Sequence, residues 1–340
     1  MRHIRILLML ASTLVSWHST AGTLPPPPYP ADNIPSEAGV KLGHTLFYDQ
    51  ILSRGNFLAC ANCHMQERAF ADPRRMSVGV HGELTERTSM PLFNLVYATH
   101  FFWDGRAPSL RAQALIPIEN TIEMDERLDN VVRKLSRRPP YPELFRSAFG
   151  DGDITPERIG LALEQFMLTL ISDDSKYDRV ENGTEHFTPA EQRGYVLFTT
   201  DKVPGKPGSG ASCVQCHTPP FFTTHAFANN GIDPANKDPG LETVSKKPED
   251  RGRFKIPSLR NIGMTKHYMH NSRFETLEEV IDYYNTGVTA TPQLDPRMAA
   301  FEEGLGLTKA QVADLIAFLH TLTDETFLNN PAHAEPKRNR

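Results

Sequence analysis

Two stretches decide how this chain folds: Cys60-Ala61-Asn62-Cys63-His64 and Cys213-Val214-Gln215-Cys216-His217. Each is a C-x-x-C-H pentapeptide, the pattern at which a c-type haem is attached. Two thiols at this spacing add to the two vinyl groups on one porphyrin edge, and the next residue is then placed beneath the iron as its proximal ligand. The chain has four cysteines, and all of them lie in these motifs. We therefore predict two covalent haems, held by Cys60, Cys63, Cys213 and Cys216, with His64 and His217 as iron ligands.

Other uses of paired cysteines fit less well. A C-x-x-C pair alone is often a thioredoxin-like redox pair or half of a zinc site. Here both copies carry the histidine, and one copy lies in each half of the 340-residue chain. A single compact zinc site built from all four cysteines fits that separation poorly. The length allows two domains of ordinary size, so we expect one haem domain in each half.

Composition narrows the class of partner. Charged residues make up 23% of the chain and the formal net charge is −5. No basic cluster is interleaved with aromatic residues, which argues against nucleic-acid binding. The acidic balance suits a cationic partner, although this signal is weak.

The first residues have the pattern of a secretory signal. Arg2 and Arg5 precede a short apolar run over residues 6–15, and small residues follow at 19–21. The run is too short to span a bilayer, and no later stretch is long and apolar enough to do so. We expect cleavage near Ala21, a periplasmic location and no integral membrane segment.

Helix-start signals recur along the chain, whereas alternating strand patterns are rare, so we expect a mostly α fold. Expected helices run over 36–47, 109–115 (stopped by Pro117), 125–135, from 155 onward, 188–198, from 276 onward and 309–322. Apolar residues at helical spacing after Thr155 predict a buried stripe. We divide the chain into a signal peptide (1–21), an N-terminal haem domain (22–182), a C-terminal haem domain (183–331) and a disordered tail (332–340).

Several longer stretches match those of a known family, and they occur in the same order as in that family from about residue 36 to residue 322. With them, the chain resembles the bacterial di-haem cytochrome c peroxidase family, which includes the MauG-type enzymes. The matching pieces, besides the two haem motifs, are residues 42–43 and 46–49, Phe102-Trp103-Asp104-Gly105-Arg106-Ala107, Gln113, Pro117, Glu123-Met124, Phe254-Lys255-Ile256-Pro257-Ser258-Leu259-Arg260-Asn261, Tyr268-Met269-His270 and Tyr283-Tyr284-Asn285-Thr286-Gly287.

The resemblance implies two cytochrome c-like helical domains whose haems face a shared interface. In the family the N-terminal haem is the peroxide site and the C-terminal haem handles electrons. By position, Glu123 matches the distal acid, Gln113 a distal hydrogen-bonding residue and Pro117 the wall of that pocket. Trp103 matches the tryptophan between the two haems.

A carboxylate at position 123 suits peroxide chemistry. Peroxide needs an open iron position and a group that takes a proton from its inner oxygen and returns it to the outer one. A half-buried carboxylate does this, because burial raises its pKa toward the working range. By itself Glu123 also fits a plain acidic residue before a helix, near Asp125 and Glu126. The matches at Trp103 and Glu123, with the family's interval between them, favour the catalytic interpretation.

The second axial ligand of the C-terminal haem divides the family between methionine and tyrosine. Here the alignment places Tyr284 at that position. A thioether raises the reduction potential, whereas a tyrosinate stabilises ferric and higher states. A bound cation removes the phenol proton despite its ordinary pKa of about 10. Tyr284 also fits a core aromatic on an amphipathic helix, and the rival ligands are Tyr283, Met264, Met269 and Met298.

Two departures from the family pattern carry expectations of their own. Members that need reductive activation place a histidine over the first haem, but the aligned residue here is Val80, with His81 one position on. We therefore predict a first iron that is open as made. The family also holds calcium between its domains, and the matching positions are Thr88, Thr265 and His267. Loss of the family's asparagine oxygen at Thr88 weakens that case, because calcium needs several oxygens.

These observations favour an exported di-haem peroxidase that reduces hydrogen peroxide with electrons from a small cytochrome c or a cupredoxin. A second hypothesis is MauG-like oxidation of residues on a partner protein. A third is a non-enzymatic di-haem electron carrier, which requires two fully ligated irons and an incidental Glu123.

Overall fold

The computed structural model describes residues 24–235 and 237–336. The predicted signal peptide lies outside these residues. The described chain is rich in helix, as predicted, and its two short strands, β1 (Phe227–Ala228) and β2 (Phe254–Lys255), pair antiparallel. The helices are α1 (Glu37–Tyr48), α2 (Leu110–Glu119), α3 (Leu128–Arg137), α4 (Tyr141–Phe149), α5 (Pro156–Leu168), α6 (Lys176–Glu181), α7 (Pro189–Thr199), α8 (Glu242–Ser245), α9 (Leu277–Thr286), α10 (Lys309–His320) and α11 (Glu325–Leu328).

Side-chain caps begin most of the long helices, as the sequence predicts. The Ser36 hydroxyl accepts a hydrogen bond from the Gly39 amide at the start of α1, and Thr155 does the same for α5. Reciprocal capping boxes open three more helices, satisfying backbone amides that have no partner inside the helix. These boxes pair Thr188 with Glu191 in α7, Thr276 with Glu279 in α9 and Thr308 with Gln311 in α10.

Two helix boundaries differ from the prediction. Helix α2 continues through Pro117 to Glu119, because a proline in the last turn removes only one intrahelical hydrogen bond. The helix predicted over 125–135 instead begins at Leu128 and ends at Arg137, since Asp125 takes a left-handed backbone conformation with φ 43°. Both differences lie next to Glu123, in a loop where turn hydrogen bonds outweigh helix propensity.

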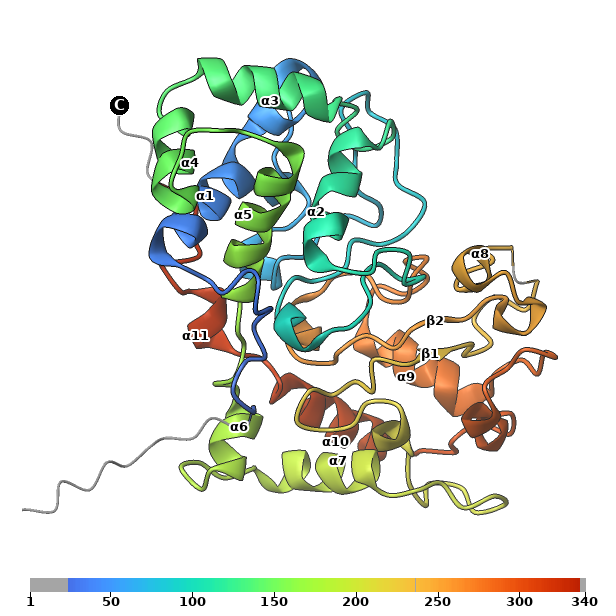
Figure 1. Cartoon of the computed structure of the whole chain (residues 1–340). Coiled ribbons are helices and arrows are strands. Elements are labelled where there is room, and N and C mark those ends of the chain that lie inside the picture. Colours follow the sequence, from blue (N-terminus) through green and yellow to red (C-terminus); the bar gives the residue numbers. More distant parts are fainter. Residues whose placement is uncertain (1–23, 236, 337–340) are drawn as a thin grey trace, which may run out of the picture.

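Each half of the chain has its own cluster of buried apolar residues. In the first, α1 crosses α5, and the predicted stripe of Ile159, Leu163, Phe166, Met167 and Leu170 is buried. In the second, α7 crosses α10, with Phe198 and Phe318 fully buried. Figure 1 shows the first half above the second, so that the two haem motifs lie in two adjoining bodies.

Each crossing depends on a glycine. A side chain at Gly43 in α1 would collide with the carbonyl oxygen of Ala162 in α5. A side chain at Gly194 in α7 would collide in the same way with the carbonyl oxygen of Asp314 in α10. The same close approach of two helices is therefore built twice, once beside each haem motif.

The C-terminal segment returns to the first half. Phe327 and Leu328 of α11 belong to the first cluster, and the ring of Phe327 lies 5.8 Å from the ring of Phe70. Beyond it, His333 is 6% exposed and its carbonyl accepts a hydrogen bond from the Tyr48 hydroxyl at 2.7 Å. The prediction of a disordered tail over 332–340 is wrong for residues 332–336, because they pack against α1; residues 337–340 lie outside the described chain.

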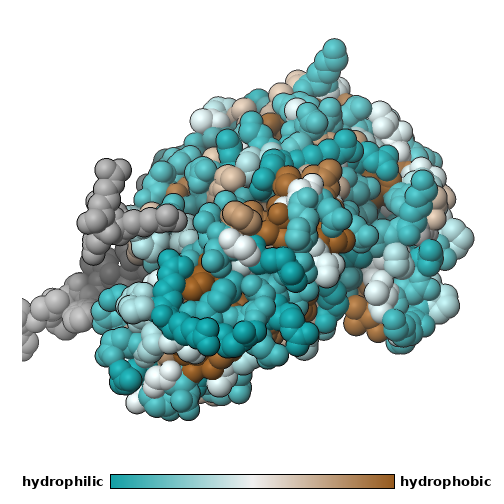
Figure 2. Space-filling model, turned by 90° about the horizontal axis from the view of Figure 1, so that it is seen from above, coloured by the Kyte–Doolittle hydropathy of each residue, from teal (hydrophilic) through white to brown (hydrophobic). Residues whose placement is uncertain are grey.

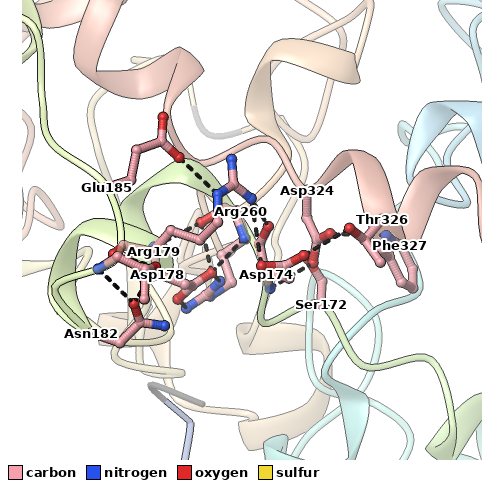
Figure 3. A network of polar contacts seen from close by, with 12 residues as sticks. Ser172, Asp174, Asp178, Arg179, Asn182, Glu185, Arg260, Asp324, Thr326 and Phe327 are labelled. Carbon is pink, nitrogen blue, oxygen red and sulfur yellow. Dashed lines mark hydrogen bonds and ion pairs between the residues drawn. The ribbon is translucent and has the colours of Figure 1, made fainter. Parts of the chain in front are cut away.

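A polar network joins the two halves where the chain crosses between them (Figure 3). Arg260 and Asp178, each 1% exposed, form two hydrogen bonds of 2.7 Å. Asn261 donates to the Ser172 hydroxyl at 3.0 Å, and that hydroxyl donates to Asp324 at 2.9 Å. Because buried charges are stable only when paired and hydrogen-bonded, this network fixes how the connecting segments run.

The surface carries few large apolar residues. Most of the face seen in Figure 2 is hydrophilic, and hydrophobic residues show in several separate places. The most exposed large apolar side chains are Phe57, Ile34 and Leu84, at 68%, 62% and 60%. They are far apart in the sequence, and single exposed apolar residues are normal on a globular surface.

Candidate active site

The first haem motif forms a tight turn that aims its histidine. Cys60–Asn62 is a single 3₁₀ turn, and the His64 amide donates back to the Cys60 carbonyl at 3.0 Å. The ring Nδ1 of His64 lies 2.7 Å from the Phe70 carbonyl oxygen. A carbonyl acceptor there fixes the proton on Nδ1, which leaves Nε2 free to bind a metal. Burial also lowers the pKa of His64, which favours the neutral, ligating ring.

The second motif repeats this arrangement. Cys213–Gln215 is again one 3₁₀ turn, and the Nδ1 of His217 lies 3.2 Å from the Phe222 carbonyl and 3.1 Å from the Pro257 carbonyl. Burial lowers the pKa of His217 to about 4, so the ring is neutral. In both motifs the cysteine thiols are free and partly buried. Free thiol pairs, a neutral imidazole and an oriented Nε2 fit covalent haem at both places.

A large cavity opens beside the first motif. Its volume is about 810 Å³, within the range of pockets that hold cofactors and ligands. All seven residues predicted for this site from the first half of the chain line it, namely Cys60, Cys63, His64, Trp103, Gln113, Pro117 and Glu123. The cavity therefore brings haem-attachment residues and a carboxylate into one space.

Glu123 sits in a constrained loop at this cavity. Its backbone carbonyl accepts a hydrogen bond from the Val80 amide at 2.7 Å, and its side chain accepts one from Asn120 Nδ2 at 2.6 Å. Burial raises the pKa of Glu123, while the Asn120 hydrogen bond and the charge of Arg106 oppose that rise. A buried carboxyl whose pKa is raised above its ordinary value suits a proton relay.

The loop over residues 76–90 crosses this cavity, but His81 does not enter it. Ser77, Val78 and Gly79 line the cavity, whereas His81 is absent from the described lining residues. Instead, His81 Nε2 lies 2.8 Å from Asp125, and half of its side chain is exposed. The contact with Asp125 therefore keeps His81 away from the described lining of this cavity.

Trp103 lies where the two halves meet. It lines the first cavity, and its indole N–H donates to the Thr88 carbonyl at 2.8 Å. Its own backbone carbonyl accepts a hydrogen bond from Lys255 in β2 at 2.8 Å. Its ring is edge-on to His270, with centroids 6.4 Å apart. The indole thus contacts residues from both haem-bearing halves.

A chain of ion pairs crosses the same junction. Arg87 binds Asp238 from the second half and Asp104 from the first, each with a closest distance of 2.7 Å. Asp104 also binds Arg106, whose guanidinium stacks 3.5 Å above the Phe102 ring. This chain holds Arg106 near Glu123. The sequence signals only its Asp104–Arg106 pair, because Arg87 and Asp238 are distant from that pair along the chain.

Tyr284 lies in the second half, close enough to the haem motif for the Cys213 and Cys216 thiols to act on its pKa. Its hydroxyl oxygen accepts a hydrogen bond from Asn230 Nδ2 at 3.0 Å. Burial raises the pKa of Tyr284 to about 12, and the Asn230 donor opposes that rise. Bound iron would remove the proton, as cations do for coordinated groups.

The rival ligands differ in their placement. Tyr283 donates its hydroxyl to the Asn230 carbonyl at 2.9 Å. Met264 packs against the first apolar cluster and Met298 is buried in the second. Met269 shares the side-chain nitrogen of Asn230 with Tyr284, because its sulfur lies 3.6 Å from that nitrogen.

The three positions matched to calcium do not form an acidic site. The Thr88 hydroxyl donates to the Met269 carbonyl at 2.9 Å and lies 2.6 Å from Ser272 Oγ. Thr265 donates to the Ile262 carbonyl, and His267 Nδ1 is buried with no hydrogen-bond partner among the described residues. Over residues 24–235 and 237–336, no group of three acidic, histidine or cysteine ligands is found. Calcium at these positions stays a prediction.

Three residues at the two sites escaped sequence reasoning: Asn120, Arg106 and Asn230. Arg106 was quoted only as part of a motif. Asn120 lies three positions before Glu123, so a local turn signal was present. Asn230 is far from Tyr284 in sequence, and only the fold brings them together. Lys255 is also notable, since it is a buried lysine at the cavity whose pKa burial lowers to about 8.

Comparisons with known proteins agree on one group. A family described as di-haem cytochrome c peroxidase matches residues 37–186. The methylamine utilisation protein MauG of Methylorubrum extorquens is 36% identical over 88% of this chain and 82% of its own. The cytochrome c551 peroxidase of Nitrosomonas europaea is 30% identical over 84% of this chain and 80% of its own.

Solved structures give the same fold. A MauG-like protein associated with microbial copper homeostasis superposes with a TM-score of 0.83 at 32% identity, covering 95% of this chain and 99% of its own. The diheme peroxidase BthA of Burkholderia thailandensis superposes with a TM-score of 0.71 at 25% identity, covering 90% and 91%. Within the described residues, no helix has the length and apolar character needed to cross a bilayer.

Proposed function

The chain belongs to the di-haem cytochrome c peroxidase family that includes MauG, and from this premise we propose that it reduces hydrogen peroxide at the His64 haem. Two c-type haems are covalently bound, one at each motif. The reaction consumes two electrons and two protons and yields two molecules of water. The electrons come from a small cytochrome c or a cupredoxin. The observation that carries the proposal is Glu123, a buried carboxyl in the same cavity as His64.

Protein groups supply the proton transfer. The haem, when bound, supplies an iron position for peroxide and a route for electrons. In its ionised form, Glu123 takes a proton from the inner oxygen of peroxide and returns it to the outer oxygen, which leaves as water. Asn120 orients the carboxylate through its 2.6 Å hydrogen bond. Gln113 lines the same cavity as a hydrogen-bonding partner for peroxide, and Pro117 forms its wall. Positioned proton relays contribute roughly 10²–10⁴-fold to such rates.

The second half delivers electrons. His217 and Tyr284 would both hold the iron of the second haem, and Trp103 lies where the two halves meet. The 22–182 and 183–331 segments are the two haem domains in this account. A tyrosinate is a hard, anionic donor that favours the oxidised metal. The second haem would therefore hold oxidising equivalents and share them through Trp103.

The site of peroxide binding needs no prior reduction in this account. His81 is paired with Asp125 and lies outside the cavity lining, so the first iron is open as made. Cyanide or peroxide added to the ferric protein will perturb the spectrum of one haem only. Bis-histidine ligation at the first haem would contradict this. If neither haem binds an external ligand, the chain is an electron carrier instead.

A second candidate activity is oxidation of residues on a partner protein, which Tyr284 in place of methionine favours. We distinguish the two by mixing the protein, hydrogen peroxide and reduced cytochrome c. Rapid, repeated oxidation of cytochrome c supports the peroxidase. Slow turnover, with a long-lived peroxide-oxidised form of the protein, supports protein oxidation.

The proposed location is the periplasm, with the signal removed near Ala21. This rests on the sequence pattern of residues 1–21 and on the haem motifs, whose attachment chemistry takes place there. Mass spectrometry of the mature protein gives both its first residue and the two covalent haems in one measurement.

A further inference from the structure

Asn230 lies at the point where two rival iron ligands meet. Its Nδ2 is 3.0 Å from the Tyr284 hydroxyl oxygen and 3.6 Å from the Met269 sulfur. It lies two positions after the end of β1, far in sequence from both neighbours. A side-chain amide nitrogen carries two hydrogens, so one N–H is available for each neighbour.

The orientation of this amide is fixed from its other end. Its Oδ1 accepts a hydrogen bond from the Ile232 amide at 3.2 Å, and its backbone carbonyl accepts one from Tyr283 at 2.9 Å. Because a backbone N–H can only donate, the Asn230 oxygen must face Ile232. The nitrogen then faces Tyr284 and Met269, and a flipped amide would lose these bonds.

The two contacts are unequal. A hydrogen bond to an anionic oxygen is shorter and about twice as strong as a neutral one, whereas a thioether is a weak acceptor. The amide therefore stabilises the phenolate form of Tyr284 far more than it stabilises Met269. It also gives the Met269 sulfur a partner other than iron.

The backbone of Met269 is held in place independently. It takes a left-handed conformation with φ 71°, and its carbonyl accepts the Thr88 hydroxyl at 2.9 Å. The flanking Tyr268 amide donates to the Phe274 carbonyl at 2.9 Å. The backbone of Met269 is thus fixed, so a change of partner for its sulfur involves the side chain alone.

We propose that Asn230 is a positioning residue that makes Tyr284, rather than Met269, the second axial ligand of the C-terminal haem. The inference rests on the proposed function, since it takes Tyr284 as that ligand. The inference adds to the proposed function by naming the residue that selects Tyr284 over Met269, whose sulfur contacts the same amide.

The test replaces the donor in the full-length, haem-loaded protein. Asn230→Leu removes both N–H groups at similar size. Asn230→Asp keeps the acceptor for Ile232 and turns the donor into an anion, so it remains informative if the leucine variant folds poorly. Electron paramagnetic resonance and the optical spectrum of the ferric protein report the ligand. A potentiometric titration reports the reduction potential of the second haem.

We expect both variants to lower the ratio of tyrosinate-bound to methionine-bound protein by about tenfold or more, since a charged hydrogen bond is lost. The reduction potential of the second haem rises accordingly. Met269→Leu alone leaves the ligand unchanged. Adding Met269→Leu to Asn230→Leu removes the competing thioether, so the tyrosinate signature of the parent protein returns.

Two outcomes overturn the proposal in distinguishable ways. If both Asn230 variants keep the parent spectrum and potential, Asn230 has no part in ligand choice although Tyr284 remains the ligand. If the unmodified protein already shows thioether ligation and Tyr284→Phe leaves its spectrum unchanged, the assignment of Tyr284 in the proposed function has failed, and the selection proposal fails with it.

Discussion

The two halves of this molecule share their haem-attachment side and differ on the other. In each, a C-x-x-C-H turn presents a histidine whose Nδ1 meets a backbone carbonyl oxygen, and each is braced by two helices that cross at a glycine. Beyond the histidine the resemblance ends. The first half has a cavity of about 810 Å³ with a buried carboxyl. In the second half, the Tyr284 hydroxyl and the Met269 sulfur both contact the side-chain amide of Asn230.

This difference teaches that attachment and chemistry are set by separate parts of the chain. The attachment side depends on five consecutive residues and their immediate turn, so it can be copied as a unit. The distal side is assembled from loops and helices far apart in sequence. A repeated motif therefore binds the same cofactor twice while the surroundings give each copy a different task.

The largest expected effect comes from removing the Glu123 carboxyl, which distinguishes the distal side of the first half from that of the second. Glu123→Gln keeps the size of the side chain and abolishes its ability to accept a proton. We expect kcat for peroxide reduction to fall by roughly 10²–10⁴-fold, the range of a positioned proton relay. Stopped-flow oxidation of a reduced cytochrome c measures this.

Glu119→Gln is the matched control for that variant. Glu119 ends α2 only four positions away, is exposed and is absent from the described cavity lining. Its activity should equal that of the parent protein. Equal activity of the Glu123→Gln protein would remove the distinction drawn between the two distal sides.

The buried ion pair beside the crossover between the two halves gives the next largest effect, on stability. Arg260→Met leaves Asp178 charged and buried, and removing one partner of such a pair costs about 3–5 kcal/mol. Arg179→Met removes an exposed pair with Glu185 in the same network, where about 0–1 kcal/mol is typical. Denaturant titration of the haem-loaded proteins gives both values. A similar cost for the two variants would show that the buried ion pair has no special role.

The sequence predicts the features that depend on neighbouring residues better than it predicts those assembled from distant segments. The haem motifs, the capping boxes and the buried stripe of α5 all depend on neighbouring residues. The structure confirms the capping boxes and the buried stripe. The predicted start of α3 and the predicted end of α2 are wrong, because tertiary contacts stabilise the turn around Asp125. Local propensity carries no record of such contacts.

The distal sites show the limit more sharply. Glu123, Gln113, Pro117 and Trp103 were found through family resemblance, and the structure brings all four to one cavity. Their roles stay predictions. Asn230 and Arg106 act on residues distant in the chain, so no spacing rule reveals them. Residues that shift the pKa of a site residue are harder to predict than the site residue itself, because they act through short contacts that exist only in the folded state.

The smallest effect tests whether the first site is tuned as its surroundings imply. Burial raises the pKa of Glu123 and the Asn120 hydrogen bond lowers it, so Asn120→Ala must raise it further. Because the ionised form takes the proton from peroxide, activity is lost at low pH, and this variant will lose it at a higher pH than the parent. A hydrogen bond to a charged group is worth about 1.5–3 kcal/mol, so the ionised fraction on the acid limb falls by about tenfold or more.

The measurement is kcat/KM for peroxide against pH, and Asn130→Ala is its control. Asn130 donates to Glu126 at 3.0 Å, a similar amide–carboxylate pair in the next turn of chain, but Glu126 does not line the cavity in the part of the chain described. The control profile should overlay that of the parent. At high pH, where Glu123 is ionised in all three proteins, their rates should converge. A uniform loss at every pH would instead mean that Asn120 shapes the cavity without tuning the acid, and the two halves would then differ in form alone.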